Sequence, residues 1–140
     1  MPTTSFATRS NEIRTRFSTL VEVPENLPTG YDNDLRFTIP ETGVWARVSV
    51  VWGPSSLQDI GSVKRTRNSG TLHIELYNEL GRGDKSLLDL IDFIVPLFRS
   101  KDISGILYRD PEVLSLGQGG KFFRVDLLCP FEYDDFETNP

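Results

Sequence analysis

The sequence is poor in the residues from which disulfide bonds, metal centres and acid–base sites are built. Cys129 is the single cysteine, which excludes an intrachain disulfide and is typical of a reducing compartment. His73 is the single histidine, and no cluster of histidine and cysteine has the spacing of a zinc site. We therefore expect neither a metal nor another cofactor.

Long apolar runs are also missing. The longest, residues 87–98, is too short to span a bilayer and contains Asp89 and Asp92, so no membrane span is expected. The N-terminal sequence MPTTSFATRSNEIR lacks the apolar core of a secretory signal. The net charge of −5 argues against a protein whose whole surface grips nucleic acid.

The composition is that of one globular domain over residues 1–140. Hydrophobic residues make up 38% and charged residues 25% of the chain, which are ordinary values. A chain of this length buries about two thirds of the surface that its unfolded form exposes, which is enough for a core without cross-links. We expect the ends, residues 1–3 and 134–140, to be flexible.

Three segments alternate between apolar and polar side chains, the pattern of a strand with one face in a core. They span residues 44–52, 71–80 and 122–131, and a less regular strand is expected within 106–116. The predicted inward rows are Val44, Ala46, Val48, Val50 and Trp52; Leu72, Ile74, Leu76 and Leu80; and Phe123, Val125, Leu127, Cys129 and Phe131. Strands with two different faces are typical of an antiparallel sheet that is covered on one side only.

Two segments have the apolar spacing of helices, residues 4–20 and 85–98. The apolar side chains of the second cover an arc of roughly 220° when each residue turns the helix by ~100°. A helix that lies on a sheet needs an apolar arc nearer ~100°. The excess must be covered by the first helix, by residues 23–43 or by another subunit.

The expected fold class is α+β, in the order helix, strand, strand, helix, strand, strand. We predict a single antiparallel sheet of about four strands with both helices packed on one face. Residues 23–43 hold three prolines and two glycines, which predicts an irregular connection with a short edge strand around 35–39. Residues 53–70 form a long polar arm between the first two main strands, and segments of this length are usually disordered or functional.

The segment GRGDKS, residues 81–86, is open to three interpretations. Its centre spells an adhesion tripeptide, and its glycines with Lys85 look like a degenerate phosphate-binding loop. A phosphate-binding loop has the pattern GxxxxGK[ST], whereas here Asp84 separates Gly83 from Lys85. Turn glycines and an N-cap aspartate before an apolar run are typical of a helix start, and this interpretation accounts for the whole segment.

Few residues suggest catalysis. His73 and Glu75 lie two residues apart in a predicted outward row and could form a hydrolytic pair, although a surface histidine in a strand is commoner. Cys129 lies in an inward row, which predicts a buried structural thiol rather than a nucleophile. The acidic segment 132–137 lacks the loop glycine and ligand spacing of a calcium site, so an exposed acidic tail is expected.

Two surfaces are candidates for binding a partner. The outward sheet face carries both signs of charge, and cross-strand ion pairs or a complementary surface on a like subunit explain it equally well. The arm tip carries positive charge in an acidic protein, which suits either a solvated mobile hairpin or contact with an acidic neighbour or passing DNA. The candidate interface residues are Arg47, Glu75, Glu79, Arg124 and Asp126 on the sheet face, and Lys64, Arg65 and Arg67 in the arm.

Three segments, taken in order, resemble the tail-terminator (tail-completion) proteins of long-tailed phages. They are GVWARVSVVWGPSSLQDIG with the basic arm after it, SGTLHIELYNELGRGDKSLLDLIDFIVPLFR, and ILYRDPEVLSLGQGGKFFRVDLLCPFEYDD. Members typically have an apolar-Arg-Val strand, then a strand leading through a Gly-Lys/Arg-Gly turn into a helix that ends like LFR. Their last strand ends like VxVPF, here VDLLCPF. The likeness lies in this order and spacing, from the N-terminal helix to about Phe131.

The resemblance implies a small α/β structural protein of the virion, without catalysis or cofactor. Such proteins form a hexameric ring on the tail tube, stop its polymerisation and offer the surface to which the head docks. The implied partners are like subunits, the tail tube protein and head–tail connector proteins, with DNA close by in the lumen. The protein would be made in the host bacterial cytoplasm. A head–tail connector or neck protein is the main alternative, and a small hydrolase using His73 and Glu75 is a lesser one.

Overall fold

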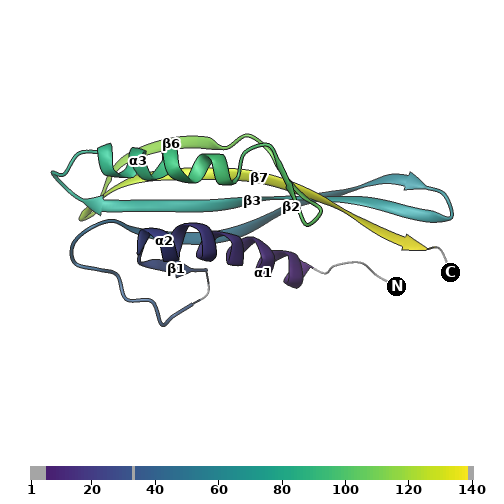
Figure 1. Ribbon diagram of the computed structural model, residues 1–140, viewed down its shortest axis with the longest axis horizontal. Helices are drawn as coiled ribbons and strands as arrows, with labels where there is room; N and C mark the ends of the chain where they lie inside the picture. The colour runs from purple at the N-terminus through teal and green to yellow at the C-terminus, as the bar shows by residue number, and fades with distance from the viewer. Residues whose placement is uncertain (1–5, 33, 139–140) are drawn as a thin grey trace.

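The computed structural model describes residues 6–32 and 34–138. Its helical elements are α1 (Phe6–Phe17), the π-helical turn η1 (Ser18–Glu22), α2 (Val23–Glu25), α3 (Lys85–Ile94) and the 3₁₀ turn η2 (Val95–Leu97). Its strands are β1 (Thr29–Tyr31), β2 (Trp45–Ile60), β3 (Val63–Glu79), β4 (Lys101–Ile103), β5 (Ile106–Tyr108), β6 (Glu112–Gly119) and β7 (Phe122–Thr138). Figure 1 shows an elongated molecule in which β2, β3 and β7 run along most of its length.

Within the described residues, the sheet is mixed and has seven strands. They follow the order β1-β2-β3-β7-β5-β4, and β6 also pairs with β7. β1 is parallel to β2, whereas the other pairs are antiparallel. The prediction of about four antiparallel strands is therefore wrong. β1, β4 and β5 have three residues each, too few for alternation to be recognised, and the edge strand lies at 29–31 rather than 35–39.

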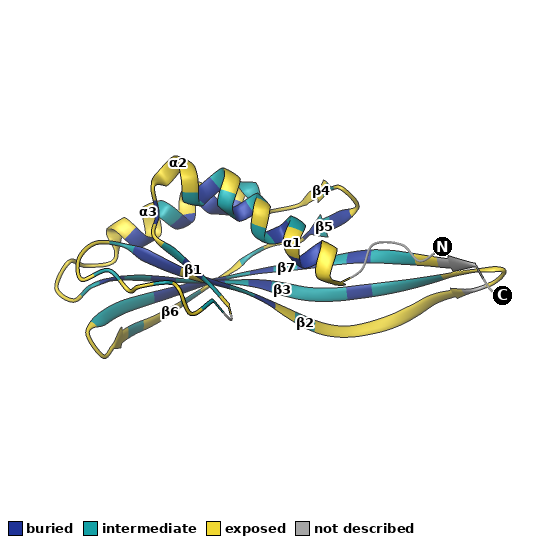
Figure 2. Cartoon of the chain, turned by 90° about the horizontal axis from the view of Figure 1, so that it is seen from below, coloured by how far each residue is buried: buried dark blue, intermediate teal, exposed yellow. Residues whose placement is uncertain are grey.

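The helices lie on one face of this sheet (Figure 2) and cover its inward rows. The inward alternation is confirmed within the long strands, where Val48, Ile74 and Leu127 are fully buried. The prediction is wrong for Leu80, which follows the end of β3 and is 39% exposed. From the helices, the same core cluster receives Ile13, Phe17, Leu87, Ile91 and Ile94. The core therefore lies between the helices and one face of β2, β3 and β7, and it leaves the opposite face without a helical layer (Figure 2).

Residues 81–86 are a helix start, as one of the three interpretations predicted. Gly81 and Gly83 have φ angles of 82° and 72°, which glycine adopts without steric cost. α3 begins at Lys85, and the Leu88 N–H donates to the Asp84 carbonyl at 2.9 Å. Asp84 therefore occupies the N-cap position, although its carboxylate caps no N–H of the described residues.

β2, β3 and β7 continue as a three-stranded arm (Figure 1), which we define as residues 53–60, 63–70 and 131–138. The segment predicted as a polar loop is thus a pair of strands. Residues 134–138, expected to be a flexible acidic end, pair with β3. The expected flexibility of residues 1–3 and 139–140 concerns positions outside the described residues.

Hydrogen bonds between polar side chains reinforce the backbone pairing of the three strands of the arm. The Ser55 hydroxyl donates to Asn68 at 2.5 Å, and the Asn68 amide donates to Asp135 at 2.9 Å. Asn68 is 3% exposed, so these bonds satisfy a buried amide from both neighbouring strands. The central strand β3 thus has side-chain partners on both β2 and β7, and these contacts help a largely polar sequence to form strands here.

One aromatic side chain of the outward row is buried against expectation. Trp45 is 2% exposed because it stacks on Tyr77, with ring centroids 4.1 Å apart, and contacts Phe122 edge-on. Phe37, from the irregular connection, approaches Trp45 to 5.8 Å. A Cβ on Gly30 would lie 2.6 Å from the Phe37 ring, so glycine at this position lets the connection fold over the edge of the sheet.

No helix within residues 6–32 and 34–138 is both long enough and apolar enough to cross a membrane.

We expect Gly70→Ala to destabilise the protein. A Cβ at this position would lie 2.7 Å from Cζ of Phe131 and 2.8 Å from the Val51 carbonyl oxygen, which is overpacking of a kind that typically costs about 1–3 kcal/mol. Urea unfolding followed by tryptophan fluorescence measures the change. Gly119→Ala is the matched control, because its Cβ would meet no atom within 4 Å. Equal stabilities of the two variants would contradict the prediction.

Candidate functional site

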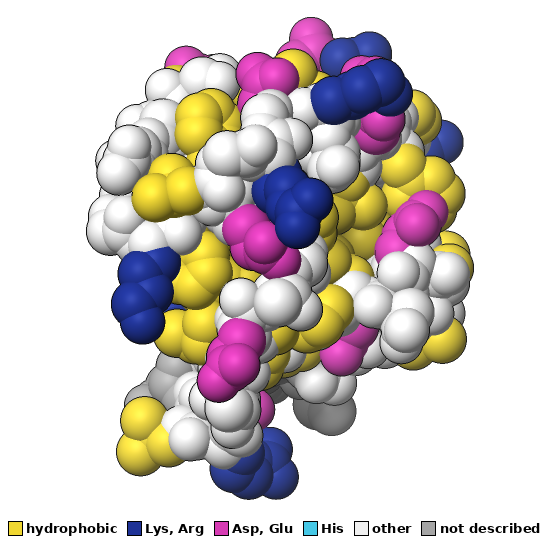
Figure 3. Space-filling model, turned by 90° about the vertical axis from the view of Figure 1, so that its left-hand side faces the viewer, with side chains coloured by type: hydrophobic (Ala, Val, Ile, Leu, Met, Phe, Trp, Pro, Cys, Tyr) yellow, Lys and Arg dark blue, Asp and Glu magenta, His cyan; other side chains and the backbone are white. Residues whose placement is uncertain are grey.

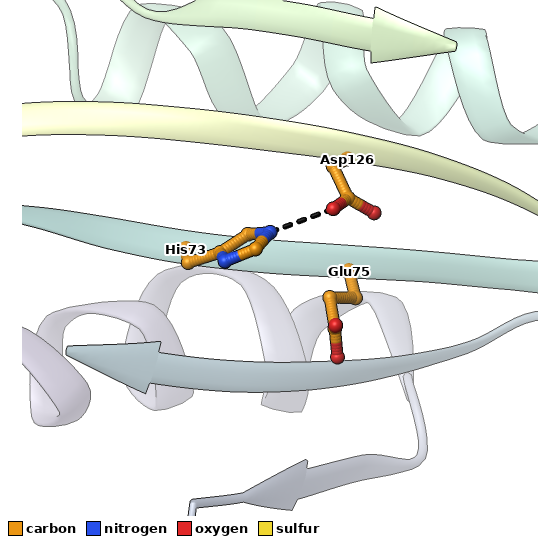
Figure 4. Close-up of side chains that lie close together, drawn as sticks. All are labelled: His73, Glu75 and Asp126. Atoms are coloured by element: carbon orange, nitrogen blue, oxygen red, sulfur yellow. Dashed lines mark hydrogen bonds and ion pairs between the residues drawn. The ribbon is translucent and has the colours of Figure 1, made fainter. Parts of the chain in front are cut away.

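An ion-pair network occupies the uncovered sheet face where β3 and β7 lie side by side. Arg124 donates to Glu75 at 2.7 Å and to both carboxylate oxygens of Asp126 at 2.7 and 2.8 Å. His73 Nε2 lies 2.6 Å from Asp126 Oδ2. Figure 4 shows His73 and Asp126 pointing toward each other from the two strands. The structure thus brings together three residues of the predicted interface and adds His73.

The network keeps a buried carboxylate ionised. Asp126 is 2% exposed, and burial alone raises its pKa. The hydrogen bonds and charges of Arg124 and His73 outweigh this effect, so the net pKa lies below the ordinary value of 3.8. The hydrogen bonds to Asp126 also raise the pKa of Arg124 more than partial burial lowers it, and the charge of Glu75 acts in the same direction. Both partners therefore stay charged across the physiological range.

The same residues have the composition of a metal site. Ligand atoms of His73, Glu75 and Asp126 all lie within 4.8 Å of one another. However, the Arg124 guanidinium already lies at hydrogen-bond distance from both carboxylates. A divalent ion would have to approach this fixed positive charge and take over its ligands. The arrangement fits two carboxylates bridged by arginine better than it fits a metal centre.

His73 and Glu75 do not form the catalytic pair that the sequence suggested. His73 hydrogen-bonds to Asp126 rather than to Glu75, which is instead paired with Arg124. Among the described residues, none with a hydroxyl or thiol hydrogen-bonds to His73, including Ser49, its neighbour on β2. Cys129 is fully buried, and burial raises the pKa of its thiol to about 12. The geometry therefore provides a histidine oriented by a carboxylate but no adjacent nucleophile.

The other predicted residues of the sheet face form no described ion pair with this network, although Arg47 lies opposite Glu75 in the strand register. Arg47 is exposed, with its guanidinium 5.8 Å from the Trp45 ring. It forms no ion pair with a carboxylate of the described residues. Glu79 accepts a hydrogen bond from the Gly43 N–H at 2.7 Å and pairs with Arg82. Glu79 therefore anchors the end of the irregular connection.

The arm is not basic, contrary to the expectation from residues 64–67. Arg67 donates two hydrogen bonds to Asp134, and Arg65 pairs with Asp59 at 3.1 Å and with Asp134 at 3.7 Å. Over its three strands the arm contains five carboxylates and three cations, a net charge of −2. The basic residues seen in the sequence are neutralised because the register places the acidic end of β7 beside them.

A hollow beside β7 was missed by the sequence analysis. It has a volume of about 480 Å³ and is lined by residues that include Arg9, Gly105, Leu107, Tyr133 and Phe136. The Arg9 guanidinium lies over the Tyr133 ring at 4.9 Å and donates to the Ser104 carbonyl at 2.6 Å. The continuing alternation of β7 through Phe131 and Tyr133 was the one signal in the sequence that this strand extends past residue 131.

The comparisons with known proteins give the fold and no function. No family model matches the chain, and no curated protein sequence matches it. Among the 12 matching chains of solved structures, one superposes with a TM-score of 0.62 at 19% sequence identity, over 93% of this chain and 96% of its own length. At this identity, the likeness shows a shared fold across the whole chain.

We expect Asp126→Asn to lower the free energy of unfolding by about 3 kcal/mol, because removing one partner of a buried ion pair leaves the other uncompensated. Chemical denaturation at pH 7 measures the loss. Asp92→Asn, at an exposed position of α3, is the control and should change little.

The stability of the native protein should also fall as the pH drops below about 4, because the lowered pKa of Asp126 makes the unfolded state bind the proton more readily. If Asp126→Asn leaves this acid dependence unchanged, the network does not stabilise the fold.

Proposed function

We propose that the protein is a ring-forming structural subunit of the phage tail-terminator kind. In this role it caps the tail tube, stops its polymerisation and provides the surface on which the head docks. The observation that carries the proposal is the order and spacing of the three resembling segments, which span nearly the whole chain. The proposed location is the virion, after synthesis in the host bacterial cytoplasm.

The uncovered surfaces of the molecule support an assembly role. A face of the central sheet has no helical layer, and an arm projects from the body (Figures 1 and 2). Subunits of a ring meet through two different patches, so each copy needs two unlike surfaces available for contact. The charged sheet face and the arm are such surfaces.

The wide apolar arc of α3 is consistent with this role. Leu88 and Phe93 of α3, and Leu80 just before it, remain between 36% and 39% exposed. Beside them is a hollow of about 460 Å³ between α2 and α3, where Leu27, Leu90 and Phe93 meet the acidic side chains of Glu25 and Asp89. Figure 3 shows hydrophobic side chains interspersed with acidic ones on this end of the molecule. Neither α1 nor residues 23–43 cover the excess arc.

A head–tail connector or neck protein is the alternative, since it shares the size and the setting. Electron microscopy of lysates from phage lacking the gene separates the two roles. Loss of a terminator gives tails of uncontrolled length, whereas loss of a connector gives normal tails beside unjoined heads. A hydrolase is disfavoured because His73 has no adjacent nucleophile among the described residues.

Native mass spectrometry of the purified protein tests the proposal directly. We expect a closed ring, with six chains as the number that the resemblance implies. A ring held by heterologous contacts gives one defined mass that persists on dilution, because each copy is held on two sides. A monomer at all protein concentrations, in the presence and absence of tail tube protein, would overturn the proposal.

Arg47→Glu should weaken the assembly more than the fold. Arg47 is exposed and forms no ion pair with a described carboxylate, but it lies opposite Glu75 in the strand register, so reversing its charge should lower the unfolding free energy by no more than about 1 kcal/mol. If the sheet face meets a neighbour, like-charge repulsion should raise the protein concentration needed for ring formation by about tenfold or more. Lys121→Glu is the matched control, because Lys121 is exposed in the turn between β6 and β7 and forms no ion pair among the described residues. Equal assembly of both variants would remove the sheet face from the interface.

A further inference from the structure

Leu35 and Arg36 form a projecting tip on the connection between β1 and β2, which we call the 35–36 tip. Leu35 is 98% exposed, more than any other large hydrophobic side chain of the described residues. The side chain of Arg36 is 92% exposed. In Figure 1 the connection loops out below β1, whereas α3 lies at the top of the view. Because burial of a leucine is favourable, the tip offers an apolar contact that the single chain does not make.

Local contacts hold the tip in shape. The Asp34 carboxylate accepts hydrogen bonds from the Arg36 N–H at 3.0 Å and from Arg36 Nε at 3.1 Å. Just beyond the tip, the Phe37 ring packs near Trp45, with ring centroids 5.8 Å apart. A segment that is already ordered loses less conformational freedom on binding, which favours its use as an anchor. The two Nη groups of Arg36 donate to no described residue and remain available to a partner.

The hollow between α2 and α3 offers apolar side chains to such an anchor. Its volume is about 460 Å³, and its apolar lining includes Leu27, Leu90 and Phe93. Phe93 is 39% exposed, and Leu90 is half-buried. A leucine from another chain would find partners here for its whole side chain, and such filled pockets provide much of the binding energy of an interface.

The charge of the hollow is complementary to that of Arg36. Among the described residues, the hollow is lined by two carboxylates, Glu25 and Asp89, and by neither lysine nor arginine. Lys85 pairs with Asp89 at 2.7 Å, whereas Glu25 is exposed and forms no ion pair within the described part of the chain. An arginine entering beside the leucine would therefore gain Glu25 as a partner. Complementary charges of this kind orient two surfaces and favour their encounter.

The tip and the hollow are two separate surfaces of one chain. Leu35, Phe37 and Arg47 line a different hollow of about 340 Å³, so the tip adjoins the sheet face on which Arg47 is exposed. No residue of the tip lines the hollow between α2 and α3. The chain thus has an apolar and cationic projection at one place and an apolar and acidic recess at another. Heterologous contacts between like subunits need two unlike patches of this kind.

We propose that the 35–36 tip of one copy docks into the hollow between α2 and α3 of the next copy. Leu35 packs against Leu90 and Phe93, and Arg36 pairs with Glu25. Each copy presents the tip once and the hollow once, so the same contact is repeated from copy to copy until the ring closes. This inference rests on the proposed ring and names the surfaces that hold it.

Cross-linking between two full-length single variants, Leu35→Cys and Ser86→Cys, tests the docking. Ser86 is exposed and lines the hollow. The two variants are mixed at a protein concentration below that of ring formation, then concentrated and treated with a short bis-maleimide. A dimer that needs both variants joins two different chains by necessity. Cys129 is fully buried, and burial raises the pKa of its thiol to about 12, which keeps it unreactive.

Leu116→Cys mixed with Ser86→Cys is the matched control, because Leu116 is an exposed leucine, at 53%, that lies on β6 rather than in the tip. The mixture with Leu35→Cys should give at least about tenfold more mixed dimer than this control, since docking holds the two thiols at a high effective concentration. Each variant alone should give only traces.

Equal yields from the two mixtures would show random collision and overturn the inference. Dimers from Leu35→Cys alone or from Ser86→Cys alone would show like surfaces in contact and overturn it as well. A ring seen by native mass spectrometry without the mixed dimer would assign the hollow to another partner, such as the tail tube protein. That result would overturn the inference and leave the proposed function standing, whereas a monomer without cross-links would overturn both.

Discussion

The unbroken pairing of β3 with β7 is the constraint on which the other features depend. It runs from Val63 opposite Thr138 to Glu79 opposite Phe122 without a register shift. This register places Ile74 opposite Leu127 beneath the helices and Glu75 opposite Asp126 on the uncovered face. A slip of one residue would exchange the two faces and expose the core. One register serves both faces of the sheet. The register that buries the hydrophobic rows on one face therefore also determines which charged side chains are neighbours on the other face.

The network on the uncovered face has the residue composition of an active site. Its histidine, its carboxylates and its arginine are the residue types of catalytic centres, and the lowered pKa of Asp126 would elsewhere suggest function. Here the single guanidinium of Arg124 hydrogen-bonds to both carboxylates. Beside the network, Arg47 is exposed next to the stacked rings of Trp45 and Tyr77.

The arm continues the same register beyond the hydrophobic core, and this explains its chemistry. Most side chains of the arm are polar, chiefly serine, asparagine, arginine and aspartate, although Leu57, Val63 and Phe136 are about half exposed there. Ion pairs and hydrogen bonds across the three strands hold the register. The result is a projecting three-stranded sheet with a net charge of −2.

The sequence alone determined what depends on neighbouring residues: the inward rows of the long strands, the two helices on one face and the helix start at residue 85. Period-two and helical spacing are local signals, so burial of Val48, Ile74 and Leu127 followed from them. Only the tertiary structure decided which partners distant residues have. His73 pairs with Asp126 rather than with Glu75, β7 neutralises the cations of the arm, and Phe37 helps to bury Trp45. These contacts join residues that lie far apart in the chain. No local pattern records them, because the sheet register that creates them is set by the packing of the whole core.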